Sequence, residues 1–361
     1  MTRPTVFHIH LDRLVSNCQK ARQLHGGKIM AVLKANAYGH GDLECARALS
    51  KVADGLAVAT LEEAVRLRDA GLQGRILLLE GVFEQAEMKE VVGHGLMTVI
   101  HHRDQLAFMR ALGPLAESLT VWVKVDTGMH RLGFDPDEVG DVVRQLESMG
   151  HAGRLTVMTH FAHADQLEGH GLEDPLRRFH SALRGLHVDT SLCNSGAILH
   201  HPKAYGDWAR PGLMLYGVDP VDTGKGSSAG LEPVMRLTSR VLWIRDLQPG
   251  ERVGYGGLFR AERPTRVGVV PCGYADGYPR TARQETPVAL GGRKAPLIGR
   301  VSMDMLTVDL TDIPDAVPGV EVELWGDRVP VCLVADGAGT LAYEVLCHAS
   351  RAEKKVHPVT G

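Results

Sequence analysis

The sequence lacks the features that mark secreted, membrane-spanning and nucleic-acid-binding proteins. Its six cysteines are scattered and form no C-x-x-C pair, so we expect no disulfide scaffold and a reducing, cytoplasmic environment. His8, His10 and Asp12 interrupt the first apolar stretch, which argues against a signal peptide, and no later segment approaches about 18 apolar residues. Forty Lys and Arg against 43 Asp and Glu leave a net charge of -3, so we expect neither nucleic acid nor a membrane as partner.

The chain has an ordinary hydrophobic content of 44% and a high number of glycines, 41 in 361 residues, which indicates many tight turns. Between residues 28 and 217, short apolar runs alternate with amphipathic stretches, the pattern of repeated βα units. The eight runs are KIMAVL (28–33), LAVAT (56–60), RILLLE (75–80), MTVI (97–100), LTVWVKV (119–125), LTVMTHF (155–161), VDTSLC (188–193) and GLMLYG (212–217).

Eight apolar strands buried on both faces and joined by helices predict a (β/α)8 barrel of the TIM type. The segments 42–52, 61–71 and 136–150 are expected helices between these strands. An open, doubly wound sheet is the alternative arrangement of the same elements.

After about residue 230 the sequence changes to short strands separated by Gly, Pro and Asp turns, which predicts a mostly β domain. The Gly- and Ser-rich passage 218–230 is the expected boundary, giving a barrel domain over 1–230 and a β domain over 231–361. The amphipathic segment 340–355 is an expected helix.

Polar residues follow several of the predicted strands, at the end of the barrel where active sites form. Lys34 ends the first strand, and it is either a solvated or ion-paired cap or a desolvated amine suited to a Schiff base. Lys124, Arg131, His160 and Arg210 lie at or near the ends of later strands. Such a set of cations indicates an anionic, planar or phosphorylated ligand.

The loops around the seventh and eighth strands commonly bind phosphate in such barrels, and they contain Asn194, Ser195, Gly212 and Leu213 here. We expect no metal, because residues three apart on a continuing strand, such as His160 and His163, would face opposite sides.

Seven motifs, in this order and spacing, resemble bacterial alanine racemase over almost the whole chain. They are AVLKANAYGHG, VKVDTGMHRLGF, THFAHAD, ARPGLMLYG, VGYGGLF, CGYADGYPR and IGRVSMDM. The resemblance implies an enzyme that depends on pyridoxal phosphate, with active sites shared across a homodimer. His130, in the second motif, stands at a position that is often glycine in the family.

The resemblance also implies roles for individual residues. Lys34 would hold pyridoxal phosphate as a Schiff base and act as one catalytic base, and Tyr255 from the partner subunit would act as the second base on the opposite face of the substrate. Without the resemblance, Tyr255 would be a half-buried strand tyrosine. Arg210 corresponds to the residue that donates a hydrogen bond to the pyridine nitrogen, which weakens the ring as an electron sink.

Further correspondences concern the remaining groups around the cofactor and substrate. The implied cofactor-binding set is Tyr38, His160, Asn194, Ser195, Gly212, Leu213 and Tyr343. Arg131 and the backbone N–H of Met303 correspond to groups that hold the substrate carboxylate and the cofactor phenolate, and Lys124 to a lysine that is often carbamylated. The residues of the polar corridor to the site, or else ordinary surface charges, are Asp165, Tyr274, Arg280 and Arg300.

The expected activity is interconversion of L- and D-alanine, either to supply D-alanine for peptidoglycan or to catabolise L-alanine. A broad-specificity amino-acid or serine racemase is one alternative. An amino-acid decarboxylase on the same architecture is another, but it would be expected to place an acid against the pyridine nitrogen, where Arg210 stands. A non-catalytic carrier of the cofactor would omit the β domain that contains Tyr255.

Overall fold

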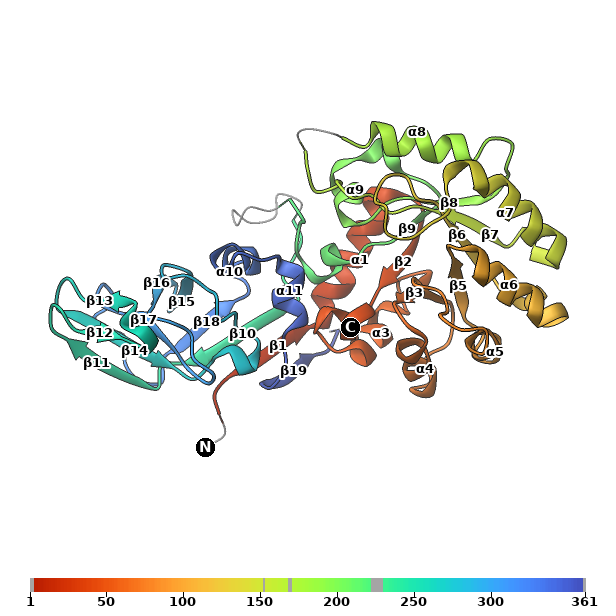
Figure 1. Ribbon diagram of the computed structural model, residues 1–361. Helices are drawn as coiled ribbons and strands as arrows, with labels where there is room; N and C mark the ends of the chain where they lie inside the picture. The colour runs from red at the N-terminus through yellow and green to blue at the C-terminus, as the bar shows by residue number, and fades with distance from the viewer. Residues whose placement is uncertain (1–2, 152, 168–170, 222–229, 360–361) are drawn as a thin grey trace.

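The computed structural model describes residues 3–151, 153–167, 171–221 and 230–359. Figure 1 shows an elongated molecule, with a barrel surrounded by helices at one end and a sheet-rich part at the other. The predicted combination of a (β/α)8 barrel and a mostly β domain is confirmed, and an open doubly wound sheet is wrong, because eight strands close in a ring.

The barrel consists of eight parallel strands in sequence order, and the last pairs with the first. Its strands are β2 (Lys28–Val32), β3 (Gly55–Val58), β4 (Ile76–Leu78), β5 (Met97–Ile100), β6 (Val121–Lys124), β7 (Leu155–Met158), β8 (Asp189–Ser191) and β9 (Trp208–Ala209). Side chains such as Ile29, Leu77, Val99 and Val123 are fully buried, as expected for strands covered on both faces.

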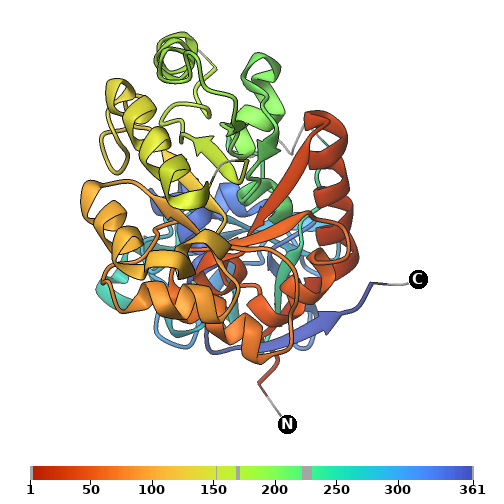
Figure 2. The ribbon, with the colours of Figure 1, turned by 90° about the vertical axis from the view of Figure 1, so that its right-hand side faces the viewer.

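Helices surround these strands as an outer ring (Figure 2). The α-helices of the barrel are α1 (Leu11–His25), α2 (Lys34–Tyr38), α3 (Asp42–Leu49), α4 (Leu61–Asp69), α5 (Glu87–Gly93), α6 (Arg103–Leu112), α7 (Val139–Leu146), α8 (Glu173–Ala182) and α9 (Ser195–His200). Shorter helical turns are η1 (Gly113–Ser118), η2 (Pro136–Glu138), η3 (Glu147–His151), η4 (Pro202–Ala204) and η5 (Leu213–Tyr216). The three helices expected near 42–52, 61–71 and 136–150 are confirmed. No helix in the described part of the chain is long and apolar enough to cross a membrane.

The eighth predicted strand, 212–217, is wrong in position. The last barrel strand is β9, four residues earlier, and residues 213–216 form the short helix η5. Pro211 has no backbone N–H to continue a strand, and the run is apolar because every residue of η5 is buried. The sixth run is also shorter than expected, since β7 ends at Met158, so the argument that separated His160 from His163 along a strand does not apply.

The β domain is built on a nine-stranded sheet with the order β11-β14-β17-β16-β15-β18-β10-β1-β19. Its strands are β1 (Val6–His10), β10 (Met235–Arg240), β11 (Trp243–Leu247), β14 (Thr265–Val270), β15 (Pro287–Leu290), β16 (Arg293–Ile298), β17 (Leu306–Asp309), β18 (Glu321–Trp325) and β19 (Glu353–His357). A two-stranded hairpin, β12 (Arg252–Val253) and β13 (Phe259–Arg260), lies at the end farthest from the barrel (Figure 1). The remaining elements are η6 (Tyr255–Gly257), η7 (Tyr274–Asp276), α10 (Val331–Ala338) and α11 (Ala342–Cys347).

Strands near both ends of the chain, β1 and β19, belong to this sheet. Strand β1 pairs antiparallel with β10 and parallel with β19, so residues 6–10 join a sheet formed mainly from the second half of the chain. The single helix predicted over 340–355 is therefore wrong in its second half, where β19 forms. The division at 218–230 stays a prediction, and residues 222–229 of that passage lie outside the described residues.

Candidate active site

A cavity of about 430 Å³ lies at the carboxyl ends of the barrel strands. Eleven of the residues singled out from the sequence line it. They are Lys34, Tyr38, Lys124, Arg131, His160, Asn194, Ser195, Arg210, Gly212, Leu213 and Tyr343. Ten come from the barrel and Tyr343 comes from α11, so the cavity lies between the barrel and a helix of the C-terminal half.

Lys34 begins a single turn of left-handed helix directly after β2. Ala35, Asn36, Ala37 and Tyr38 have φ between 51° and 55°, a conformation that costs an L-residue about 1–2 kcal/mol. The carboxylate of Glu63, in the first turn of α4, accepts hydrogen bonds from the N–H groups of Ala35 (2.7 Å) and Ala59 (2.8 Å). Strain of this kind persists where surrounding contacts hold it, and here it places Lys34 and Tyr38 on the same cavity.

Tyr38 is buried between aromatic rings at the wall of the cavity. Its ring stacks on Tyr216, with centroids 4.7 Å apart, and lies 5.9 Å from the ring of Tyr343. A Cβ atom at position 212 would stand 2.5 Å from the Tyr38 hydroxyl, so this close approach requires Gly212. Burial raises the pKa of Tyr38 far above its usual range, so its hydroxyl is a donor at any physiological pH.

Two buried backbone donors beside this tyrosine have no acceptor among the described residues. The hydroxyl of Ser195 accepts from the N–H groups of Gly212 (3.0 Å) and Met214 (3.2 Å). The N–H groups of Ser195 and Leu213, both buried residues that line the cavity, find no protein acceptor in the described ranges. Because buried donors are almost always paired, this corner of the cavity fits an anionic group such as a phosphate.

Four cations surround the cavity, and Glu80 is the one carboxylate among its described lining residues. Arg210 is buried and donates to the Ser191 hydroxyl (2.5 Å) and to the Thr159 carbonyl, both neutral groups. Burial lowers the pKa of Arg210 to about 10, which still leaves it charged at neutral pH. The cavity therefore holds a cation that no described carboxylate neutralises.

Lys124 and His160 respond to this concentration of positive charge. Burial, and then the charges of Arg131, Arg210 and Lys34, lower the pKa of Lys124 to about 8. Burial and the same neighbours, with Lys124 among them, lower the pKa of His160 to about 3. His160 is therefore neutral at physiological pH, and part of the Lys124 population carries a neutral amine.

Tyr255 does not lie on this cavity. It belongs to η6, in the hairpin between β12 and β13, and its side chain is 70% exposed. It lines a separate groove on the β domain together with Arg300 and Ser302. Within one chain, Lys34 and Tyr255 thus line different cavities.

The other predicted substrate and corridor residues are also outside the barrel cavity. Met303 and Tyr274 lie in neighbouring loops of the β domain, and both are exposed. Arg280 follows η7, and Asp165 lies in the segment between β7 and α8; both are exposed. The structure thus separates the predicted site into a barrel part and a surface of the β domain.

Two reactive side chains of the cavity, Glu80 and Cys347, were missed from the sequence. Glu80 ends the third apolar run, and the rule that polar residues ending strands line the site would have found it. Cys347 lies four residues after Tyr343 on α11, and helical spacing puts both on one face. Burial raises the pKa of Cys347, so it stays a thiol.

Family models for the N-terminal and C-terminal domains of alanine racemase match residues 9–220 and 234–357. The chain belongs to the alanine racemase family. The curated alanine racemase of Azoarcus sp. is 52% identical over 349 residues, which cover 97% of this chain and 98% of that relative. The solved structure of the biosynthetic alanine racemase from Pseudomonas aeruginosa is 44% identical in sequence and superposes with a TM-score of 0.93. The match covers 99% of this chain and 100% of that one.

Membership of the alanine racemase family makes this chain an isomerase. The alanine racemase of Bartonella henselae was solved with covalently bound pyridoxal phosphate. It is 29% identical, with a TM-score of 0.88, and the match covers 98% of this chain and 99% of that one. The barrel cavity has what such a group needs, because it combines an amine (Lys34), two buried N–H donors that have no acceptor among the described residues, and the charge of Arg210, which no described carboxylate neutralises.

Proposed function

We propose that this protein is an alanine racemase that interconverts L- and D-alanine with pyridoxal phosphate bound to Lys34. The observation that carries the proposal is the composition of the barrel cavity. A lysine amine, a tyrosine hydroxyl, a buried arginine and two N–H donors without an acceptor in the described ranges line one space of about 430 Å³. That combination suits a covalently held, phosphorylated and planar cofactor.

When bound, pyridoxal phosphate supplies an electron-withdrawing ring that makes the α-proton of an attached amino acid removable. Tyr38 and the N–H groups of Ser195 and Leu213 would hold the phosphate, with Tyr343 beside Tyr38. Asn194 would help to shape this corner, since its side chain caps α9 by accepting from Ala197 N–H at 3.1 Å. These groups bind and orient; none of them needs to move a proton.

Racemisation requires a proton to leave one face of the α-carbon and return to the other. The amine of Lys34, freed once substrate has taken its place, would serve one face. Tyr255 would serve the other face, and it has to come from a second copy because it lies on a different cavity of its own chain. The hairpin at the end of the β domain is well placed for such a contribution, since it points away from its own barrel (Figure 1). We therefore propose a homodimer with two shared sites.

Arg210 would donate to the pyridine nitrogen. A guanidinium cannot accept a hydrogen bond, so it keeps that nitrogen unprotonated and limits the electron sink. Its other donors are directed by Ser191 and the Thr159 carbonyl, and His160 beside it stays neutral. A decarboxylase would profit from an acid at this position, and the described residues around Arg210 include none within ion-pair distance.

Lys124 is a candidate for carbamylation. Its pKa of about 8 leaves neutral amine to react with carbon dioxide, and the N–C bond that forms releases one proton. The new carboxylate would offset the charges of Arg131 and Arg210 and orient Arg131 toward the substrate carboxylate. Exchange with carbon-13 bicarbonate, followed by nuclear magnetic resonance, should yield one slowly exchanging carbamate signal that is absent in Lys124→Met.

The exposed residues would act across the interface or at its rim. The Met303 N–H, which has no acceptor among the described residues, would face the substrate or cofactor oxygen of the partner's site. Asp165 would line the path to its own cavity, and Tyr274, Arg280 and Arg300 the path to the partner's. Cys18, Cys45, Cys193, Cys272 and Cys347 form no disulfide, which supports a cytoplasmic location.

The test is a chiral assay of the cofactor-loaded protein with each amino acid in deuterated water. We expect alanine to racemise fastest, with deuterium at Cα of the product isomer and much less in the recovered substrate. The reason is that one base removes the α-proton and a different base, in exchange with solvent, returns one to the opposite face. Comparable rates with serine or other amino acids would favour a broad-specificity racemase. Release of carbon dioxide without racemisation would favour a decarboxylase.

A further inference from the structure

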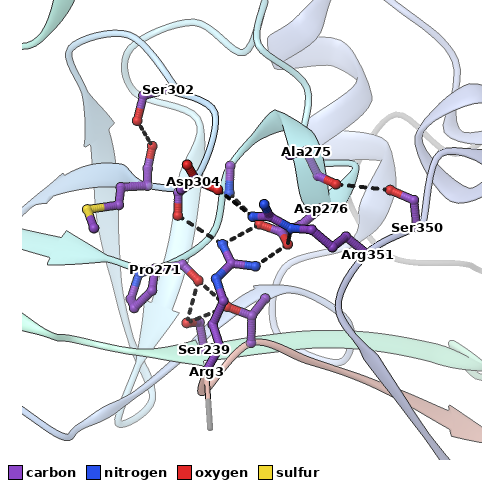
Figure 3. Close-up of polar contacts among 12 residues, drawn as sticks. Arg3, Ser239, Pro271, Ala275, Asp276, Ser302, Asp304, Ser350 and Arg351 are labelled. Carbon is purple, nitrogen blue, oxygen red and sulfur yellow. Dashed lines mark hydrogen bonds and ion pairs between the residues drawn. The ribbon is translucent and has the colours of Figure 1, made fainter.

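A group of ion pairs lies in the β domain, away from the barrel cavity, at the point where both ends of the chain meet its loops. Asp276 is at its centre, with a side chain that is completely buried. Arg3 pairs with both carboxylate oxygens of Asp276, one of them at 2.6 Å, and Arg351 donates to it at 3.2 Å (Figure 3). The N–H of Gly273 donates to the same carboxylate at 2.9 Å.

The same two arginines continue to the loop 302–305. Arg3 donates to the carbonyl of Asp304 (2.9 Å), and Arg351 donates to its carboxylate (2.6 Å). With two guanidiniums and two carboxylates the group is electrically balanced. Burial opposes ionisation of Asp276, but the hydrogen bonds from Arg3, Gly273 and Arg351 outweigh it and lower its pKa. The Asp276 carboxylate is therefore charged throughout the physiological range.

These contacts hold two loops against each other. The carbonyls of Ser302 and Met303 accept from the N–H groups of Tyr274 and Ala275, each at 3.1 Å. A Cβ at Gly273 would stand 2.3 Å from the Ser302 carbonyl oxygen, which shows how closely the backbones approach. The side chains of Met303 and Tyr274 remain exposed at this contact between the two loops.

The group also reaches the helix that lines the barrel cavity. Ser350 donates from its N–H to the Asp276 carbonyl (3.3 Å) and from its hydroxyl to the Ala275 carbonyl (3.2 Å). Ser350 and Arg351 follow α11 closely, and α11 contributes Tyr343 and Cys347 to the cavity. One buried carboxylate thus connects the cavity-lining helix of a subunit to the loops that carry Tyr274 and Met303.

We propose that Asp276, bridged by Arg3 and Arg351, is a positioning residue that fixes the Tyr274 and Met303 loops for the substrate-binding half of the partner's active site. This inference rests on the proposed function, because those loops matter to catalysis only if a second copy receives them. A surface that must meet another subunit with hydrogen-bond precision needs its loops set before the subunits associate. The ion pairs provide that rigidity from both chain ends.

The test compares Asp276→Asn and Arg351→Lys with a matched control, Asp312→Asn. Asp312 pairs with Arg263 through two hydrogen bonds on the exposed surface of the same domain. Asparagine keeps the shape of Asp276 and removes its charge. Lysine cannot contact Asp276 and Asp304 at once, as Arg351 does through its Nε and Nη2 atoms.

We expect both network variants to raise KM for L- and D-alanine by about tenfold while kcat falls much less, because the loss is in substrate positioning. Affinity for pyridoxal phosphate, measured by its absorbance, should stay near the wild-type value, since the barrel holds that group. Asp312→Asn should match wild type in every measurement.

The outcomes separate a positioning role from a structural one. A lower melting temperature with KM and kcat unchanged in the folded, dimeric fraction would overturn the proposal, as would the same KM change in Asp312→Asn. If Asp276→Asn does not fold, Arg351→Lys alone decides, because Arg351 lies at the surface of the group. An inactive or monomeric wild-type protein would instead refute the proposed function.

Discussion

Single residues of the barrel cavity create an excess of positive charge among the described residues that line it. Lys34, Lys124, Arg131 and Arg210 share the space with Glu80, and His160 is held neutral by its surroundings. The Arg210 guanidinium donates to two neutral acceptors, but no described carboxylate neutralises its charge, and a buried charge without a counter-ion is costly. The cavity is therefore suited to an anionic group, in agreement with the N–H donors of Ser195 and Leu213, for which the described part of the chain offers no acceptor.

The Gly212→Ala variant tests the phosphate corner. The added Cβ would stand 2.5 Å from the Tyr38 hydroxyl and push that ring from its stack on Tyr216. We expect affinity for pyridoxal phosphate to fall by about tenfold or more, equivalent to at least about 1.4 kcal/mol. Titration of the cofactor followed by absorbance measures it. Gly93→Ala, where a Cβ meets nothing within 4 Å, should bind the cofactor as wild type does.

His40 gives the fold a defined sensitivity to acid. It is buried, and burial lowers its pKa to about 4 from 6.5 even though its ring N–H donates to the carbonyls of Ala37 and Tyr38. Between these values the unfolded chain binds a proton that the folded chain does not. The contribution of His40 to the unfolding free energy is thus complete above pH 6.5 and is lost as the pH falls toward 4.

Urea unfolding at several pH values measures this effect. Between pH 6.5 and about 4, each unit of falling pH should remove about 1.4 kcal/mol of unfolding free energy through His40 alone. In His40→Gln the pH dependence should be shallower by that amount. Equal slopes for the two proteins would contradict the assignment.

Most single residues of the cavity could be predicted because they follow apolar runs, and Glu80 obeys the same rule. Cys347 could not be found in this way, since its place depends on how α11 packs against the barrel. The conformation of His130 explains the one departure noted in the sequence. With φ of 53° it adopts the left-handed region that favours glycine, and its hydrogen bonds to Asp126 hold it there.

At the scale of elements, the left-handed turn of α2 is the most unusual feature of the barrel. Four consecutive non-glycine residues have positive φ, held by Glu63 and by the Asn36 side chain, which accepts from the Asp42 N–H at 3.0 Å. No sequence rule for helices predicts this turn, because propensities describe right-handed helices.

The substitution Ala35→Gly measures the strain in that turn. Glycine adopts positive φ without the Cβ penalty, so we expect the unfolding free energy to stay level or rise by up to about 1 kcal/mol. The matched control is Ala107→Gly, at an exposed position within the right-handed helix α6, which should lose about 1 kcal/mol. A loss of equal size in both variants, seen in thermal unfolding, would show that the turn stores no strain.

Two elements were mispredicted for one reason, which is that local pattern carries no information on distant partners. The apolar run 212–217 is buried as η5 and is not a strand. The segment 353–357 has helical amphipathicity in sequence but pairs in parallel with β1, more than 300 residues away along the chain. The barrel could be predicted because seven of the eight apolar runs overlap barrel strands β2 to β8, whereas the eighth run lies after β9.

At the scale of the whole molecule, the shape separates the proposed bases. The barrel cavity contains Lys34, and the hairpin with Tyr255 is at the opposite end of an elongated chain (Figure 1). Sequence resemblance can suggest a shared site, but only the fold reveals that one chain cannot bring the two side chains together. Dimerisation is thus part of the catalytic proposal and more than an accessory to it.

The most direct test mixes two inactive variants, Lys34→Ala and Tyr255→Phe, and refolds them together so that mixed dimers can form. In a mixed dimer one of the two shared sites regains both an intact amine and an intact phenol. Random pairing gives half mixed dimers, each with one working site, so about a quarter of wild-type racemase activity should return. Activity no greater than the sum of the two separate variants would contradict the account.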